Sequence, residues 1–236
     1  MGRAYHRWSR ITPHGVPWGR RQWGPRPPQY KLYTDVPVFP LPTPPQIPMS
    51  VSLALERRRS IRDYTGYPIS PDALSALLHA AQGITEPSYP KRAAPSAGAL
   101  YPLELYAILH RVRDVEPGLY HYRVTEHALE QLRLGDLRKP ITRICLDQEH
   151  AHTAAVVFVI TGVFARTEWK YEGRAYRYVL QEVGHVGENI YLAATGLGLG
   201  ACAIGAYFDE ELDALLGVDG EEETSLYVLT VGQPAI

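Results

Sequence analysis

The run from Arg57 to Arg62 contains four arginines and one serine, Ser60. A guanidinium group can donate two parallel hydrogen bonds to a phosphate, and a serine hydroxyl adds a third donor. Because Arg58, Ser60 and Arg62 alternate, an extended backbone would point all three in the same direction. The run therefore predicts a phosphate anchor. The alternative is a solvated helix end, since arginine near a helix C-terminus complements the helix dipole.

A second segment, from Ala94 to Pro102, is rich in small residues and reads Ala-Pro-Ser-Ala-Gly-Ala-Leu-Tyr-Pro. Small residues let the backbone approach a flat ligand closely. The segment is not a phosphate-binding P-loop, because no Gly-Lys-Ser or Gly-Lys-Thr follows it. Its composition is therefore consistent with a loop that lies beside a planar group.

The elements that position these segments begin near residue 49, where the composition changes sharply. Residues 1–48 hold 11 of the 20 prolines and three of the four tryptophans. Proline at this density opposes regular helix and favours extended chain. This arm is either disordered or lies on a surface, such as that of a second subunit, and its aromatic residues favour a surface. Residues 49–236 form the domain proper.

Within the domain, periodicity predicts alternating helices and strands. Ser70 can cap a helix that starts at Pro71 and ends near Gly83. Residues 156–160 are a hydrophobic, mainly β-branched run typical of a buried central strand. A long helix is predicted from about 175 to 197, with apolar residues at steps of three and four. The other predicted elements are helices over 50–60 and 209–216 and strands over 103–109, 118–123, 128–134, 153–164 and 225–232.

Gly184 and Gly187 lie inside the long predicted helix. Glycine in a helix interior costs about 1 kcal/mol relative to alanine. The apolar stripe of this helix, as predicted, comprises Val179, Val183, Val186, Ile190, Ala194 and Leu197. We therefore expect another helix or a cofactor to approach closely at the glycines.

The bulk composition excludes several classes of protein. The net charge of −1 gives no overall attraction to nucleic acid or to an anionic membrane. No apolar run reaches the roughly 18 residues of a membrane span, and no apolar core follows the N-terminal arginines as in a secretory signal. Two cysteines, Cys145 and Cys202, are too few for a disulfide framework and are expected to be buried thiols in the cytoplasm.

Other chemical motifs are weak. His150 and His152 form a His-x-His sequence near acidic residues, but no second metal-binding pair accompanies them, so we expect no metal site. His185 is interpreted as a packed helix residue. A serine nucleophile is excluded by the lack of Gly-x-Ser-x-Gly, and the basic arm matches no nucleic-acid-binding module.

Five segments in order resemble the nitroreductase superfamily, and more narrowly its SagB-type dehydrogenase branch. The resemblance covers about residues 50–236, and the arm lies outside it. It rests on Arg58–Tyr64, on Pro95–Tyr106, on Lys170-Tyr171-x-x-Arg174-x-Tyr176-Arg177, on Glu182-x-Gly184-His185-x-x-x-Asn189, and on a terminal Val-Gly-Gln-Pro.

This resemblance implies an α+β, nitroreductase-like fold, in which helices flank a mixed or antiparallel central sheet. It also implies a homodimer whose long central helix lies at the interface, with flavin mononucleotide (FMN) sites lined by both subunits. The implied FMN contacts are Arg58, Arg59, Ser60 and Arg62 at the phosphate and ribityl chain, Pro95, Ser96, Ala97, Gly98 and Ala99 along the ring, and Ala203, Ile204 and Gly205 on its other face. Ala99 stands where many nitroreductases carry a flavin-binding asparagine, so that contact is not carried over.

Lys170 and Tyr171 precede the long helix. From the residues alone, a surface lysine and a packing tyrosine are the simpler interpretation. In SagB-type enzymes that make azoles, a matching Lys-Tyr pair is associated with catalysis. Oxidation of an azoline removes a hydride to the flavin and a proton to a base, and a lysine held neutral by burial could accept that proton with help from the phenol.

The sequence therefore predicts an FMN-dependent oxidoreductase of SagB type that dehydrogenates azolines in a modified peptide or a related natural product. One alternative is a nitro or quinone reductase with NAD(P)H as co-substrate. An alternative of another class is a non-catalytic flavin-binding or scaffold subunit of a modification complex. No nicotinamide fingerprint is present, but in this superfamily the nicotinamide stacks on the flavin.

Overall fold

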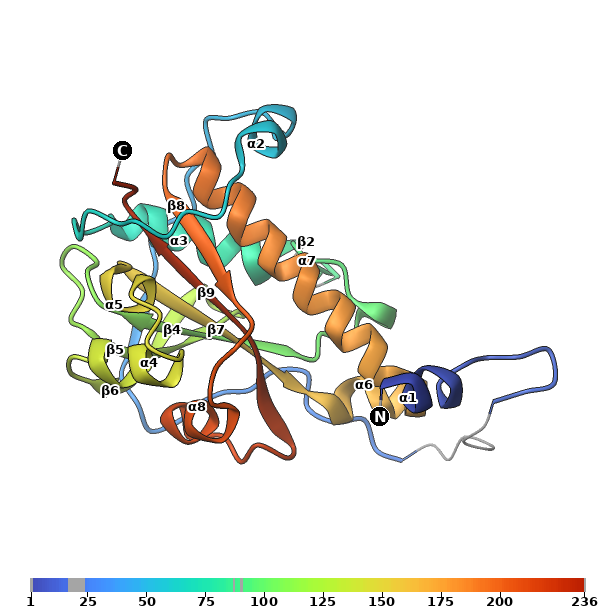
Figure 1. Ribbon diagram of the computed structural model, residues 1–236. Coiled ribbons are helices and arrows are strands. Elements are labelled where there is room, and N and C mark those ends of the chain that lie inside the picture. The colour runs from blue at the N-terminus through green and yellow to red at the C-terminus, as the bar shows by residue number, and fades with distance from the viewer. Residues whose placement is uncertain (1, 17–23, 87, 90, 236) are drawn as a thin grey trace.

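Seven antiparallel strands form the central sheet of the computed structural model, which describes residues 2–16, 24–86, 88–89 and 91–235. Their order across the sheet is β1-β6-β5-β4-β7-β9-β8 (Figure 1). The strands are β1 (Val38–Pro40), β4 (Leu103–Leu109), β5 (Gly118–Arg123), β6 (Ala128–Leu134), β7 (Val156–Val163), β8 (Gly200–Ile204) and β9 (Glu223–Gly232), and a separate hairpin pairs β2 (Ile84–Glu86) with β3 (Lys91–Arg92).

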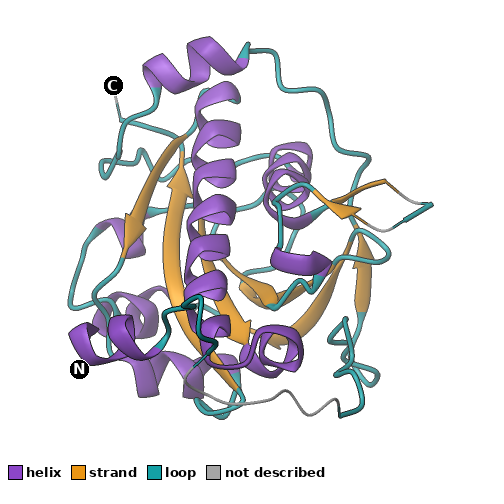
Figure 2. Ribbon diagram, turned by 90° about the vertical axis from the view of Figure 1, so that its right-hand side faces the viewer, coloured by secondary structure: helices purple, strands orange, loops and turns teal. Residues whose placement is uncertain are grey.

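Helices cover both faces of this sheet. They are α1 (Gly2–Trp8), α2 (Val51–Arg57), α3 (Pro71–Gln82), α4 (Arg138–Ile144), α5 (His150–Thr153), α6 (Phe164–Tyr171), α7 (Ala175–Gly196) and α8 (Asp209–Leu216), with short 3-10 turns at Ala97–Ala99 and Glu172–Arg174. The long helix α7 runs across one face (Figure 2). The predicted α+β fold, with helices flanking an antiparallel sheet, is confirmed.

Alternate residues of the central strands face opposite helical layers. On β4, Leu103 and Leu105 pack into a core with α3 and α7, whereas Tyr106 and Ile108 pack into a second core with α4, α5 and α8. All seven residues of β4 are buried. A strand covered on both faces needs no polar side. The same burial explains the continuous apolar run predicted over 156–160, which lies on β7.

Helix α7 buries the stripe that its periodicity predicts. Val179, Val186 and Ile190 are fully buried against the sheet and α3. Gly187 permits the close approach expected of it, because a Cβ there would lie 3.0 Å from the ring of Tyr227. Gly184 differs: it is exposed, and no described atom lies within 4 Å of the Cβ position. Gly187 therefore permits a close contact with Tyr227, whereas Gly184 leaves the surface of the helix open.

Several predicted boundaries are wrong. The helix predicted over 50–60 ends at Arg57, because Arg58 leaves helical geometry and Ser60 pairs with Ala201 of β8. The strand predicted over 153–164 is shorter: Thr153 ends α5 and Phe164 begins α6. Strand β8 was not predicted, since its Gly-Ala-Cys-Ala sequence has low strand propensity. Helices α4, α5 and α6 were also not predicted.

Several parts of the arm lie on this chain itself. Residues 2–8 form α1, a helix that the proline argument missed because it precedes the first proline, Pro13. Ser9 is fully buried and binds Arg174 and Arg177 at the start of α7. Further along, β1 adds an edge strand to β6, so this part of the arm is built into the sheet. Trp18 and Trp23 lie outside the described residues.

A buried charge network lies where the arm crosses the sheet. His121 contacts Glu130 at 2.6 Å and Glu104 at 3.2 Å, and Arg166 contacts Glu104 at 2.6 Å. The backbone N–H of Lys31 donates to Glu104. Burial alone would raise the pKa of Glu104, but the hydrogen bond from His121 and the charge of Arg166 hold that pKa at about 2.

Both cysteines are buried free thiols, and burial raises the pKa of Cys145 to about 12. Among the helices that the structure describes, none is both long enough and apolar enough to cross a bilayer.

The substitution Glu104→Gln is expected to lower the free energy of unfolding by about 3–5 kcal/mol at neutral pH, because Arg166 and His121 lose a buried counter-charge. In the unmodified protein the folded-state pKa of Glu104 lies below its ordinary value of 4.5. The stability that the Glu104 carboxylate contributes to the fold is therefore fully present above pH 4.5 and is lost as the pH falls toward 2. Urea unfolding between pH 7 and pH 3 measures both effects.

The control is Glu126→Gln, at an exposed carboxylate that pairs with Arg123 on the surface. Exposed pairs contribute about 0–1 kcal/mol, so its unfolding curve should stay close to that of the unmodified protein. Equal losses in the two variants would contradict the assigned role of Glu104.

Candidate functional site

The arginine run leaves α2 and continues as extended chain along β8. Ser60 forms a parallel bridge with Ala201, and the Ile61 N–H donates to the Ala201 carbonyl at 2.8 Å. Ser60 and Arg62 are exposed and Arg58 is partly buried. The segment is therefore extended, and on extended backbone alternate side chains point in the same direction.

Tyr191 of α7 holds this segment in place. Its hydroxyl lies 3.1 Å from the Ser60 Oγ and accepts from the backbone N–H of Ala203 at 2.7 Å. The Arg58 guanidinium lies over the Tyr191 ring at 5.4 Å, and its Nε lies 3.9 Å from the Glu188 carboxylate. One phenol thus joins the arginine run to the end of β8. Sequence reasoning missed Tyr191, whose only signal was a tyrosine beside the apolar stripe.

Three of the four arginines lie in different environments. Arg59 donates to the carbonyls of Glu56 and Arg58 at the end of α2, so its guanidinium binds backbone. Arg62 is exposed and lies close enough to His150 for its positive charge to add to burial in lowering the pKa of that histidine. Arg58 and Arg62 therefore flank Ser60, while Arg59 is engaged elsewhere.

The end of β8 belongs to the same group as the arginine run. Ala203 is partly exposed, Ile204 is buried, and Gly205 is exposed with no described atom within 4 Å of its Cβ position. We call this group, with Arg58, Ser60 and Arg62, the anchor group.

A second group forms around the loop that follows β3. Gly98, Ala99 and Tyr101 all have positive φ, at 65°, 53° and 48°. For residues with a Cβ this conformation is costly, so other contacts must hold the loop. The Ser96 hydroxyl accepts from the Tyr101 N–H at 2.9 Å and closes the turn. Pro95 and Ala97 flank this serine.

Lys170 and Tyr171 lie directly against this loop. A Cβ on Gly98 would come within 2.9 Å of the Lys170 Nζ and 2.8 Å of the Tyr171 hydroxyl oxygen. The Lys170 ammonium also lies over the Tyr171 ring, and that ring makes an edge contact with Tyr178. A Cβ at position 98 would therefore require the ends of both side chains to shift. We call this group, residues 95–101 with Lys170 and Tyr171, the loop group.

Glu182 lies beneath the loop group on the inward face of α7. It is 2% exposed, and its Oε1 has no hydrogen-bond partner among the described residues. Burial raises the pKa of this carboxyl to about 7, while Ser96 and the charge of Arg92 act in the opposite direction. Carboxyls with such shifts are found at functional sites more often than elsewhere.

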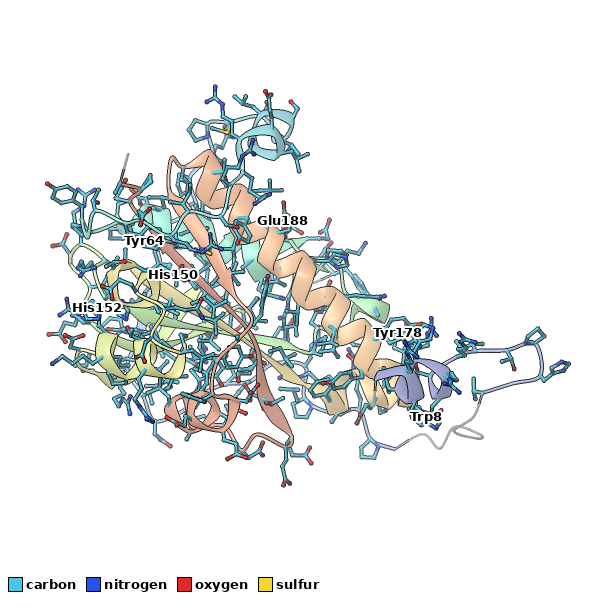
Figure 3. All side chains as sticks on the ribbon, viewed as in Figure 1. Trp8, Tyr64, His150, His152, Tyr178 and Glu188 are labelled. Atoms are coloured by element: carbon cyan, nitrogen blue, oxygen red, sulfur yellow. The ribbon has the colours of Figure 1, made fainter. Side chains whose placement is uncertain are left out.

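The anchor group and the loop group lie near opposite ends of α7. Tyr191 and Glu188 contact the anchor group, whereas Lys170 and Tyr171 immediately precede the helix. Figure 3 labels Glu188 toward one end of α7 and Tyr178 toward the other. Because α7 has 22 residues, it is about 33 Å long. The two groups therefore contact different parts of this helix.

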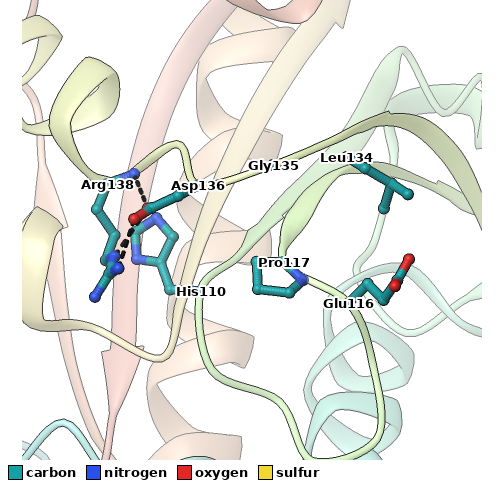
Figure 4. Close-up of a pocket in the computed structure, with 7 residues that line it drawn as sticks. All are labelled: His110, Glu116, Pro117, Leu134, Gly135, Asp136 and Arg138. Carbon is teal, nitrogen blue, oxygen red and sulfur yellow. Dashed lines mark hydrogen bonds and ion pairs between the residues drawn. The ribbon is translucent and has the colours of Figure 1, made fainter.

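A separate hollow of about 250 Å³ lies between β4, β5 and the start of α4. His110, Pro117 and the Asp136–Arg138 ion pair line it (Figure 4). Burial lowers the pKa of His110 to about 4. None of the residues predicted to bind a cofactor lines this hollow. Within the described ranges, no three His, Cys, Asp or Glu side chains converge on one point.

Comparison with known proteins identifies the family. The sequence profile described as the nitroreductase family matches residues 55–233. The chain belongs to the nitroreductase family. It is accordingly an oxidoreductase, and the matched region contains both the anchor group and the loop group.

This nitroreductase-family chain is 36% identical over 192 residues to MJ1384 of Methanocaldococcus jannaschii, which is named as a nitroreductase, covering 80% of this chain and 95% of that protein. A solved nitroreductase structure from Ralstonia eutropha superposes with a TM-score of 0.74 at 27% identity, covering 92% of this chain and 97% of the other. The structure of the Escherichia coli microcin synthetase McbBCD complex with truncated pro-MccB17 gives a TM-score of 0.68 at 25% identity, covering 80% and 74%.

Other relatives are longer than the region they share with this chain. The chain spans 47% of the trifolitoxin-processing protein TfxB of Rhizobium leguminosarum, with which it shares 26% identity over 175 residues, covering 69% of this chain. It spans 38% of a solved nitroreductase chain from Anabaena variabilis, at 31% identity, 78% coverage of this chain and a TM-score of 0.69.

The contact at Gly98 can be separated from backbone strain by a matched pair of variants. Gly98→Ala and Gly198→Ala place alanine at similar φ, 65° and 71°, but only Gly98 faces other side chains. Each should lose about 1 kcal/mol of unfolding free energy, because the crowded atoms at Gly98 are mobile side-chain ends. Only Gly98→Ala should move Lys170.

The measurement is NMR of the four lysines after isotopic dimethylation, with the Lys170 signal assigned through Lys170→Arg. A shifted Lys170 signal in Gly98→Ala, unchanged in Gly198→Ala, supports the contact. An unchanged signal in both variants contradicts it.

Proposed function

We propose that this chain is an FMN-dependent oxidoreductase of SagB type that dehydrogenates azolines in a peptide or a related natural product. The observation that carries the proposal is the contact of the Lys170 Nζ and the Tyr171 hydroxyl with Gly98. A lysine amine and a phenol thus meet at a loop of small residues, as a proton-handling pair beside a flat cofactor would require.

The anchor group fits the phosphate end of FMN. Ser60 is exposed between Arg58 and Arg62, and extended backbone points the three side chains the same way. Gly205 leaves open space at the end of β8, where a flat ring can approach without meeting a side chain. Arg59 would act indirectly, by closing the end of α2 from which the run departs.

The loop group would handle the proton. FMN, when bound, would supply the hydride acceptor for the oxidation. Lys170, in its neutral form, would accept the proton released from the azoline carbon at its Nζ. Tyr171 would orient that nitrogen, since its hydroxyl and the Lys170 Nζ both lie against Gly98. Gly98, Pro95, Ser96, Ala97 and Ala99 would shape the floor beneath the ring.

We further propose a homodimer with shared sites. The two groups lie near opposite ends of α7, so a complete site needs the anchor group of one copy and the loop group of another. Two antiparallel copies of α7 related by a two-fold axis would bring these groups together twice. Tyr176 and Leu180 are exposed apolar residues on α7, and Gly184 leaves the same helix open for close approach.

A peptide substrate is supported by two of the comparisons. The microcin B17-processing protein McbC of Escherichia coli is 24% identical to this chain over 192 residues, covering 79% of this chain and 67% of that protein. The related solved complex contains truncated pro-MccB17. Modification-complex partners would follow from the same likeness.

A second candidate is an NAD(P)H-dependent reductase of nitro or quinone compounds. It is favoured by the similarity to MJ1384. The identity to MJ1384, 36%, is higher than the 24% identity to McbC, and the match covers 95% of MJ1384. Anaerobic mixing distinguishes the two functions: rapid bleaching of the bound flavin by NAD(P)H supports the reductase, and slow bleaching supports azoline oxidation.

Substitution of the lysine tests the assignment directly. Lys170→Ala should bind FMN as the unmodified protein does but oxidise an azoline peptide at least about 100-fold more slowly, because a positioned base contributes about that much. Flavin absorbance and peptide mass loss measure the two properties. Full oxidation with FMN bound would refute the role of Lys170, and a colourless unmodified protein would favour the scaffold alternative.

Hybrid dimers test the shared site. Arg62→Ala should fail to hold FMN, and Lys170→Ala should fail in oxidation. In a mixed dimer, one site combines the intact anchor group of one copy with the intact loop group of the other. Random mixing of equal amounts should therefore restore about a quarter of unmodified activity. If each site lay within one chain, mixing would restore none.

A further inference from the structure

We propose that the N-terminal arm positions Lys170 and Tyr171, and that Ser9 is the positioning residue through which it acts. The inference rests on the proposed function only for the statement that this pair is catalytic. The arm precedes residues 55–233, the region that the family profile matches, so the family likeness does not imply this role. The domain binds the arm by hydrogen bonds on both sides of the pair.

On the N-terminal side of the pair, two residues of α6 bind the backbone of the arm. The Arg166 Nε donates to the Pro28 carbonyl at 2.8 Å. The Trp169 Nε1 donates to the Gly24 carbonyl at 2.9 Å. Trp169 directly precedes Lys170, and both donors lie on the helix that ends with the pair. The arm is therefore bound to α6 up to the residue next to the lysine.

On the C-terminal side, Ser9 is the centre of the contact, where α1 lies beside α6 and the start of α7 (Figure 1). Ser9 is fully buried. Its Oγ donates to the Tyr5 carbonyl at 2.7 Å and accepts from the Arg177 Nε at 2.7 Å. Its carbonyl accepts from the Arg174 guanidinium at 2.9 Å. Because both acceptors belong to one residue, the hydroxyl fixes the position of the carbonyl.

Arg174 carries the contact from the arm to the pair. The guanidinium that binds the Ser9 carbonyl also donates through its Nε to the Tyr178 hydroxyl at 3.2 Å. The Tyr178 ring makes an edge contact with the Tyr171 ring, with centroids 4.9 Å apart. The Tyr171 hydroxyl in turn lies against Gly98. The arm thus reaches the loop group through one guanidinium and two aromatic rings.

The backbone that follows the pair needs this support. Glu172 has a φ of 45° and a ψ of −132°. A residue with a Cβ keeps such a costly conformation only where its surroundings hold it. The carbonyl of the next residue, Gly173, accepts from the Tyr5 hydroxyl at 3.4 Å, and Arg174 follows it. The arm therefore holds the two residues after Glu172, and its release would let this backbone relax and redirect the pair.

Substitution of Ser9 in the full-length protein tests the inference. Ser9→Ala removes the hydroxyl that binds Arg177, and the matched control, Arg7→Ala, removes an exposed side chain from the same helix, α1. The first readout is the NMR signal of Lys170 in the dimethylated protein. It should shift in Ser9→Ala and stay in place in Arg7→Ala.

The second readout is steady-state oxidation of an azoline peptide. A displacement of about 1 Å can cost about 100-fold in rate, so kcat of Ser9→Ala should fall at least about tenfold. KM and the amount of bound FMN should stay close to those of the unmodified protein, because the arm contacts lie at the loop group and not at the anchor group. Arg7→Ala should keep full kcat.

A double-mutant cycle tests whether Ser9 acts through Arg177. Arg177→Ala breaks the same bond from the other side and should shift the same Lys170 signal. The double variant should lose no more in kcat than the larger of the two single variants, because only one bond is shared between them. Losses that multiply would overturn the assigned role of Ser9.

An unchanged Lys170 signal in Ser9→Ala would also overturn the proposal. So would an unchanged kcat in Ser9→Ala when Lys170→Ala has lost oxidation. If Lys170→Ala keeps full oxidation, the proposed function fails, whereas a shifted Lys170 signal in Ser9→Ala still supports the positioning contact. Because the NMR measurement needs neither an azoline nor oxidation, the two failures are distinguishable.

Discussion

Helix α7 must bury one continuous apolar stripe against the sheet and α3, and this requirement sets where the candidate residues lie. Once Val179, Val186 and Ile190 face inward, Glu182 is directed beneath the loop after β3, and Tyr191 is directed toward the arginine run. The hydrophobic packing of one helix thus places a buried carboxyl near one half of the candidate site and the Tyr191 hydroxyl against the other.

Side chains with a local pattern were predictable from the sequence. The alternation of Arg58 and Arg62 about Ser60 depends only on extended backbone, and Ser70-Pro71 specifies a helix start through its own hydrogen bonds. The contact between Gly98 and Lys170 was not predictable in this way, because these residues are far apart in sequence and meet only through tertiary packing. Tyr191 was missed for the same reason: its partners come from three separate elements. The site assignments thus owe more to family resemblance than to residue chemistry.

The two buried acidic residues on either side of Arg92 behave in opposite ways. Glu104 has counter-charges on several sides and its pKa is lowered to about 2, whereas Glu182 has few partners and its pKa is raised to about 7. The difference lies in the number of donors that reach each carboxyl rather than in depth of burial, since both are nearly inaccessible. A well-satisfied carboxylate makes a rigid part of the fold, and an under-satisfied one leaves its neighbourhood responsive to protonation.

The arm has a consequence for the order of folding. Lys31 bonds the carboxylate of Glu223, and the backbone of Tyr33 donates to Glu130. These partners are separated from the arm by 192 and 97 residues. During synthesis the arm emerges before these partners, and it cannot complete its contacts until β9 has left the ribosome. Docking of this part of the arm is therefore a long-range step, which waits for a strand 192 residues further along the chain.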